Sequence, residues 1–183
     1  LSAEFRVITP DLLGQGESGN VGYVHSIEEM AEAVTFILRH EKVKSFKVIG
    51  HSMGGYVALA MAENAPKTIS GLVLFHSTAY ADTEERKKDR ERVIGLVQKS
   101  KVVYINAVVP SLFANESKFA LKDQIEELIA TATSYSDQGI ISNIRGMMDR
   151  KDRSHVLKNG AFPKLIIHGT LDSVISTSDI ELQ

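Results

Sequence analysis

The sequence of 183 residues contains no cysteine, and this absence excludes several kinds of protein at once. Without thiols the chain has no disulfide framework and no thiolate nucleophile, and it can form no zinc site with cysteine ligands. A chain without disulfides agrees with a cytoplasmic protein, although it also permits secretion. The cytoplasm is therefore the expected location.

The sequence also has little net charge and no long apolar run. A formal net charge of -2 gives no electrostatic reason to expect nucleic acid or an acidic membrane surface as a partner. No apolar run approaches the roughly 18 residues of a membrane-spanning helix. The first residues, LSAEFRVITP, have no initiator methionine and lack the basic start and apolar stretch of a signal peptide. What remains is an ordinary globular composition, with no partner expected among nucleic acids or membranes.

Four short apolar segments predict β-strands, at residues 5–9 (FRVIT), 46–49 (FKVI), 72–75 (LVLF) and 165–168 (LIIH). Helical patterns lie between the first three. One of them begins at Ser26, which forms a capping-box pattern with Glu29. Strands that alternate with helices indicate a parallel sheet covered by helices. The expected fold class is therefore α/β.

Residues 78–160 differ from the rest, because they are helical in pattern and poor in strands. They open with a charged run at 82–92, in which Asp82 and Glu85 predict a helix N-cap pair and the run predicts a solvated helix face. Two further helical patterns lie near 119–132 and 140–148. We therefore predict a core formed by residues 1–77 and 161–183, with a helical cap inserted at 78–160.

The motif GHSMG at residues 50–54 carries the clearest chemical signal. In a G-x-S-x-G pattern between a strand and a helix, the serine lies on a sharp turn that exposes its hydroxyl. The pattern predicts Ser52 as a nucleophile and the amide of Met53 as an oxyanion donor. Positions 50 and 54 are expected to require small residues, here Gly50 and Gly54, because the strand and helix backbones approach closely. A structural turn without chemistry is the alternative.

A second candidate is Asp172, which ends the stretch GTLD directly after the fourth predicted strand. A carboxylate at the end of a later strand is where an acid that orients a catalytic histidine lies. A helix cap is the alternative role for this residue. Together with Ser52, in the order serine then acid, Asp172 is predicted to be the catalytic acid.

Three stretches make the sequence resemble the α/β-hydrolase superfamily: FRVITPDLLGQGESG, KVIGHSMGGYVALAMA and RKDRSHVLKNGAFPKLIIHGTLD. They are similar to the family's fourth strand and loop, its nucleophile elbow, and the return from a helical cap to the acid-bearing strand. The resemblance implies an incomplete parallel-sheet α/β-hydrolase core with an inserted helical cap. It also implies a cofactor-free serine hydrolase of a carboxylic ester or lactone, acting through an acyl-serine intermediate. A C–C bond hydrolase, a haloperoxidase-like enzyme and a non-catalytic binding module are the alternatives.

The sequence departs from the family at both ends. The family's first strands and its His-Gly oxyanion loop precede the strand that residues 5–9 resemble, and its catalytic histidine follows the acid by a further strand. Here only residues 1–4 come before, and no histidine follows Asp172. The expectation is a fragment of a longer hydrolase whose base lies outside these residues. His76 and His155 are the substitute bases considered within the chain.

The substrate pocket and a metal site can be addressed only in outline. His76 is predicted to line the pocket mouth, and four apolar cap residues are predicted to line the pocket: Leu112, Phe113, Ile144 and Met148. Ordinary core packing of the cap is the alternative for those four. No H-x-x-x-H or H-E-x-x-H pattern occurs, so no metal site is expected. The expected partner is a small ester or lactone, while the exact substrate and the oligomeric state stay open.

Overall fold

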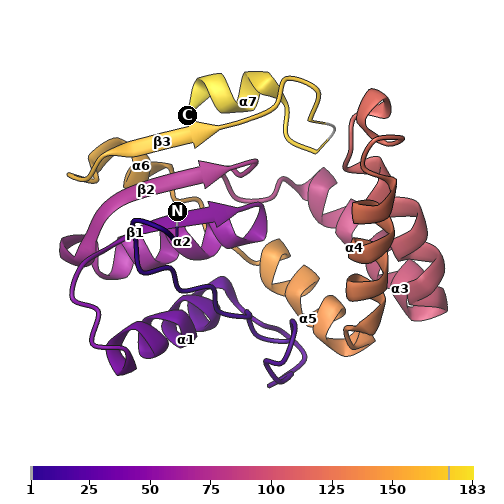
Figure 1. The fold of residues 1–183 in the computed structure, drawn as a ribbon, viewed down its shortest axis with the longest axis horizontal. Helices are drawn as coiled ribbons and strands as arrows, with labels where there is room; N and C mark the ends of the chain where they lie inside the picture. Colours follow the sequence, from indigo (N-terminus) through magenta and orange to yellow (C-terminus); the bar gives the residue numbers. More distant parts are fainter. Residues whose placement is uncertain (1, 173) are drawn as a thin grey trace.

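A computed structural model describes residues 2–172 and 174–183, and it contains one three-stranded parallel sheet (Figure 1). The strands lie in the order β1 (Phe46–His51), β2 (Ile69–Phe75) and β3 (Lys164–Ile167). Their register aligns the last residues, so that His51 lies beside Phe75 and Phe75 beside Ile167. The α/β class expected from the alternating pattern is confirmed. All three strands end at the same edge of the sheet.

The strand predicted at residues 5–9 is not formed, and this prediction is wrong. These residues have no regular secondary structure and pair with no strand in the described part of the chain. A β-branched run becomes a strand only when a neighbouring strand accepts its hydrogen bonds and covers its side chains. Phe5 and Val7 are instead about half exposed. The local pattern was sufficient for β1, β2 and β3 because each of them has a partner.

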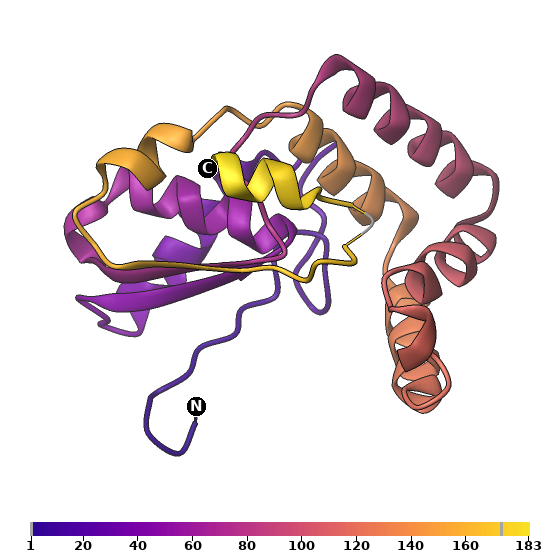
Figure 2. The ribbon, with the colours of Figure 1, turned by 90° about the horizontal axis from the view of Figure 1, so that it is seen from above.

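Helices cover one face of the sheet, and the apolar core lies beneath them. Helices α1 (Ile27–His40), α2 (Met53–Asn64) and α6 (Ser154–Asn159) lie on this face (Figure 2). The capping box predicted at Ser26 is confirmed, with the hydroxyl accepting from the Glu29 amide and the Glu29 carboxylate accepting from the Ser26 amide. Helix α2 is buried on almost every side, which suits its run of small and apolar residues.

The opposite face of the sheet carries no helix of the described chain (Figure 2). Four large apolar side chains that point to this face are exposed. They are Ile49, Phe75, Leu165 and Ile167, with 39% to 56% of their surface accessible. Successive residues of a strand point to opposite faces, so the same strands supply a buried set and this exposed set.

Between β2 and α6 the chain forms three helices that stand beside the sheet (Figure 1). They are α3 (Glu84–Ser111), α4 (Lys122–Ser134) and α5 (Asp137–Met148). Helix α3 is broken at Ser100, whose backbone is extended (φ -166°, ψ 98°) and whose hydroxyl accepts from the Val103 amide. A small apolar cluster of Ile105, Val109 and Ile125 joins α3 to α4. None of the described helices has the length and apolar character needed to cross a membrane.

Short elements complete the chain. Two 3₁₀ turns, Pro66–Thr68 and Asn115–Ser117, follow α2 and α3, and α7 (Thr177–Leu182) follows β3. Val156 and Leu157 of α6 belong to the core cluster beneath the sheet. The division of the chain into core and cap stays a prediction, and this packing would end the cap before α6 begins at Ser154.

The predicted role of Asp82 as a helix N-cap is wrong. Thr83 caps α3, because its hydroxyl accepts from the Arg86 amide. The Asp82 side chain is fully buried and forms ion pairs with Arg90 (2.5 Å) and Arg150 (2.5 Å). The charged run is therefore not entirely a solvated face. Arg150 lies 68 residues further along the chain, so local spacing could not reveal this partner.

A second polar contact joins α5 to the loop that precedes α1. The His25 ring is fully buried there, where its Nε2 accepts from the Val21 amide (3.2 Å) and its Nδ1 donates to Asn143 Oδ1 (2.8 Å). The Ser142 hydroxyl donates to the Gly22 carbonyl (2.7 Å). We call this contact, together with the ion pairs of Asp82, the cap seam.

Candidate active site

Ser52 lies on the sharp turn between β1 and α2, with a backbone conformation that L-residues rarely adopt (φ 49°, ψ -119°). The turn is fixed by hydrogen bonds from the Ser52 amide to the Phe75 carbonyl (3.0 Å) and from the Ser77 hydroxyl to the Ser52 carbonyl (2.8 Å). The Ser52 side chain is exposed and makes no capping hydrogen bond to α2. This is the geometry of an elbow that presents a hydroxyl above the end of the sheet.

The glycines around the turn have different roles. A Cβ at Gly50 would collide with the backbone of Gly54 and Gly55, and a Cβ at Gly55 would collide with the Ser77 side chain. A Cβ at Gly54 would meet nothing within 4 Å. The expectation that the strand and helix backbones approach closely is therefore confirmed at Gly50 and is wrong at Gly54. Gly55 also lies at a close contact, with the Ser77 side chain.

Met53 is the first residue of α2, so its amide has no acceptor within the helix. The helix dipole adds a partial positive charge at the same end. An anion formed on a substrate carbonyl next to Ser52 would find this amide nearby. The position agrees with the predicted role of Met53 as an oxyanion donor, a role that stays a prediction.

Asp172 lies in the loop after β3, and its carboxylate is oriented by several donors. Its Oδ1 accepts from the amides of Val174 (2.7 Å) and Ile175 (3.0 Å), and its Oδ2 faces His76 Nδ1 at 2.5 Å. Burial acts to raise the pKa of the Asp172 carboxyl, but the hydrogen bonds from His76 and the two amides outweigh it, and the pKa is lowered. Asp172 is therefore held ionised.

His76 follows the last residue of β2, and its ring contacts the acid. Because an ionised carboxylate only accepts hydrogen bonds, Nδ1 of His76 carries a hydrogen and donates it in the bond to Asp172 Oδ2. The backbone of His76 has a positive φ of 46°, and its amide donates to the Ile167 carbonyl (2.9 Å). His76 and Asp172 are 96 residues apart in the chain. The sequence places His76 at the pocket mouth and among the substitute bases, but no local pattern predicts its pairing with Asp172.

The remaining histidines near the site have distinct surroundings. The His51 ring packs against Phe75, with 5.3 Å between the ring centroids, and burial together with the nearby His76 lowers its pKa. His168 is buried next to Asp172. His155 is half-exposed and pairs with Glu63 of α2 (2.9 Å), so it does not reach inward as one interpretation of the sequence required.

The four predicted pocket residues lie in different parts of the cap. Leu112 is exposed at the end of α3, and Phe113 packs against the apolar cluster that joins α3 to α4. Ile144 is buried in α5, and Met148 ends that helix. In the described part of the chain, none of the four forms a hydrogen bond with Ser52. The packing of Phe113 favours ordinary core packing for this residue, and the lining role of the four stays a prediction.

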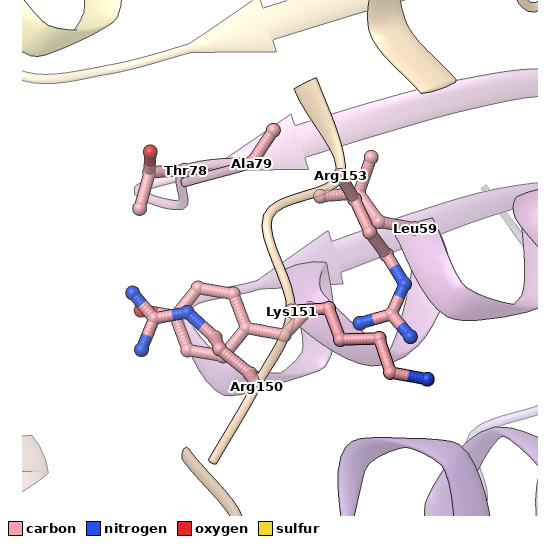
Figure 3. A pocket seen from close by; sticks show the side chains of 7 residues that line it. Leu59, Thr78, Ala79, Arg150, Lys151 and Arg153 are labelled. Atoms are coloured by element: carbon pink, nitrogen blue, oxygen red, sulfur yellow. The ribbon is translucent and has the colours of Figure 1, made fainter. Parts of the chain in front are cut away.

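A junction between α2, the segment after β2 and residues 150–153 is shown in Figure 3. The Arg150 guanidinium lies over the Tyr56 ring, 4.1 Å from its centroid, and Arg153 binds Glu63 (2.9 Å) and Glu28 (2.8 Å). The space among these side chains does not admit a water molecule. The cationic groups here therefore serve packing and ion pairing, and this junction is not a substrate pocket.

An exposed serine on a strained strand-to-helix turn and an oriented carboxylate at the end of a later strand occur together in this sheet. The model of the α/β hydrolase fold matches residues 1–181. The chain belongs to the α/β-hydrolase fold family. The resemblance noted from the elbow and acid motifs is therefore confirmed, and so is the fold class.

Solved structures with the same fold include an esterase and an enol-lactonase. The chain is similar to a thermophilic esterase from Thermogutta terrifontis, with 30% identity, a TM-score of 0.89, and coverage of 98% of this chain and 67% of the other. It has the fold of an enol-lactonase from Burkholderia xenovorans, at 20% identity and a TM-score of 0.83, over 92% of this chain and 64% of the other.

One curated relative is the dihydrolipoyllysine-residue acetyltransferase component of an acetoin cleaving system from Pseudomonas putida. It is 26% identical over 97% of this chain and 48% of its own length. The chain spans about half to two thirds of the length of the curated relatives that it matches.

Proposed function

We propose that Ser52 is the nucleophile of a serine hydrolase that cleaves a carboxylic ester or lactone through an acyl-serine intermediate. The strained backbone of Ser52 carries this proposal, because strain is retained where it serves a purpose, and here it exposes a hydroxyl that has no structural partner in the turn. The likeness to an esterase supports the substrate class. Since the chain spans only part of its relatives' length, the reaction is proposed for the whole protein.

The proposed chemistry assigns one role to each group. An imidazole oriented by Asp172 takes the proton of Ser52 Oγ, which then attacks the carbonyl carbon of the substrate. The Met53 amide stabilises the oxyanion that forms. The imidazolium returns its proton to the leaving alcohol oxygen, and an acyl-Ser52 remains. Water, deprotonated by the same imidazole, releases the acid and restores Ser52.

We assign the imidazole role to His76 for this chain. Its support is the 2.5 Å contact of Nδ1 with Asp172, which leaves Nε2 as the nitrogen able to accept a proton. The ring is about one-third exposed at the end of the sheet, so a substrate could reach it. No hydrogen bond joins Ser52 Oγ to a histidine in the described chain, and unliganded active sites often tighten only with substrate. This assignment differs from the expectation based on the sequence, in which the catalytic base lies outside residues 1–183.

Labelling with a fluorophosphonate probe tests the proposal. We expect the folded chain to be labelled at Ser52 and the Ser52→Ala variant to remain unlabelled. Ser70→Ala is the matched control, because Ser70 is also exposed on the sheet but does not lie on the turn. If neither the chain nor the full-length protein is labelled while folded, the enzyme proposal fails and a non-catalytic binding module is favoured.

The same assay assigns the base. Asp172→Asn and His76→Ala are each expected to slow labelling at least about a hundredfold, the lower range for loss of general-base assistance. Circular dichroism of each variant confirms that it is folded. If Asp172→Asn slows labelling and His76→Ala does not, the base is another histidine and the assignment of His76 is wrong.

A further inference from the structure

Three metal-ligating side chains meet at the carboxyl ends of β2 and β3. His76 Nδ1 lies 2.5 Å and His168 Nδ1 lies 3.7 Å from the same oxygen, Asp172 Oδ2. One ligand atom from each of the three residues lies within 4.8 Å of the others. Zinc bound tetrahedrally at about 2.0–2.1 Å places its ligand atoms about 3.3 Å apart. Small side-chain shifts would therefore bring the three atoms to coordinating distance.

The His168 ring supplies a second, independent observation. Only 6% of its side chain is exposed, and neither ring nitrogen has a hydrogen-bond partner within residues 2–172 and 174–183. Buried polar groups are almost always paired, so an unpaired buried imidazole that faces a carboxylate requires an explanation. A cation between the His168 ring and the Asp172 carboxylate would provide the missing partner.

The remaining features of the cluster also suit a metal ion. The amides of Val174 and Ile175 bind the other oxygen, Oδ1, and such outer contacts fix the orientation of a ligating carboxylate. His76 is about one-third exposed, which gives an ion a route to the site and leaves a coordination position open. Two imidazoles and one carboxylate favour late first-row divalent ions such as Zn²⁺ over Mg²⁺ or Ca²⁺.

We propose that His76, His168 and Asp172 form a binding site for Zn²⁺ or a similar transition-metal ion. The spacing motifs of the sequence could not reveal it, because His76 follows β2 while His168 and Asp172 follow β3, far along the chain. On binding, the ion takes the place of the proton between His76 Nδ1 and Asp172 Oδ2, and that proton is released to solvent. A second consequence, which rests on the proposed hydrolase function, is that the bound ion withdraws Asp172 from catalysis and inhibits the enzyme.

Zinc titration of the folded chain against a chromophoric chelator tests the site without any reference to activity. We expect one equivalent of Zn²⁺ to bind, and His76→Gln or His168→Gln to weaken binding at least about tenfold. His155→Gln is the matched control, because His155 is exposed and pairs with Glu63 outside the cluster. Co²⁺ bound to the chain should show the intense visible absorption of a four-coordinate site, and the two glutamine variants should lose it.

The outcomes separate this site from the proposed function. Zinc affinity that is equal in the chain, His76→Gln and His168→Gln would overturn the metal site. If the buried His168→Gln variant does not fold, the accessible His76→Gln variant decides the question. Fluorophosphonate labelling with and without Zn²⁺ then tests inhibition, which we expect in the chain and at least tenfold less in His76→Gln relative to its own metal-free rate. A chain that binds Zn²⁺ but is never labelled retains the site and loses the hydrolase.

Discussion

The core beneath the sheet and the cap seam are held together by different physical interactions. In the core, helices α1 and α2 and strand β2 bury apolar side chains such as Met30, Leu59 and Leu72 almost completely. In the seam, buried charges and polar groups make the contact, above all Asp82 with Arg90 and Arg150. Apolar packing is non-directional and tolerates substitution, whereas a buried ion pair is sensitive to the loss of either partner. The cap seam is therefore expected to be more sensitive than the core to the loss of a single side chain.

Among the variants that test this comparison, Asp82→Asn should reduce the free energy of unfolding most. It leaves the buried Arg150 guanidinium without its counter-charge, and breaking such a pair costs about 3–5 kcal/mol. Urea unfolding measures the loss. Asp89→Asn is the control, because Asp89 also lies on α3 but pairs with Arg92 at the surface, where about 0–1 kcal/mol is at stake. Equal losses in the two variants would show that the seam is not held by the buried pair.

Gly146→Ala tests how closely α5 approaches the loop before α1. A Cβ at Gly146 would collide with the His25 carbonyl oxygen, so the backbone must shift, with an expected loss of about 1–3 kcal/mol. Gly95→Ala in α3 is the control, since a Cβ there meets nothing within 4 Å. Alanine is favoured over glycine within a helix by up to about 1 kcal/mol, so this variant should gain stability. Thermal unfolding of both variants gives the sign and the size of each effect.

Thr83→Ala removes the N-terminal capping residue of α3, the first helix of the helical cap. The Thr83 hydroxyl accepts from the Arg86 amide (3.2 Å), and losing such a cap costs about 1 kcal/mol. Thr131→Ala, on the exposed side of α4, removes no capping bond and should not reduce stability. A loss in Thr131→Ala as large as in Thr83→Ala would refute the capping role. Unfolding in urea resolves a difference of this size.

Replacing Glu28 should change stability least, and the change should depend on pH. Burial acts to raise the pKa of Glu28, but hydrogen bonds from Arg153 and Lys151 outweigh it and lower the pKa below 4.5. A carboxyl whose pKa is lowered by folding adds stability above its unfolded pKa, and the addition is lost as pH falls through the folded pKa. Glu28→Gln should therefore match the parent chain at low pH and fall below it above about pH 4.5.

Glu32→Gln provides the control for this pH dependence. Glu32 is exposed on the same helix and takes part in no described ion pair. Its stability curve should follow that of the parent chain at every pH. A Glu28→Gln curve parallel to the parent curve over the whole range would contradict the ion-pair account.

The features that could be predicted from the sequence are those with local causes. The elbow at Ser52 follows from adjacent residues and a close approach at Gly50, and the capping box follows from Ser26 and Glu29. Strands β1, β2 and β3 follow from short apolar runs. Each of these depends on residues within a few positions of one another.

The features that could not be predicted depend on partners far along the chain. His76 meets Asp172 across 96 residues, and His25 meets Asn143 across 118. Residues 5–9 have the composition of a strand but lack a strand to pair with. The sequence does contain a signal for the cluster: a histidine lies at the end of each of two predicted strands, and His168 precedes Asp172 by four residues. This signal can be used only if β2 and β3 are known to be adjacent in the sheet.

The positive φ of Ser52 has a consequence for anyone who engineers this chain. Glycine occupies that region without strain, so Ser52→Gly should relieve the turn while removing the exposed hydroxyl. A laboratory selection that rewards heat resistance alone would therefore favour loss of the hydroxyl at position 52. A screen for thermostable variants therefore needs a direct test of Ser52 at every round, such as covalent labelling by the fluorophosphonate probe.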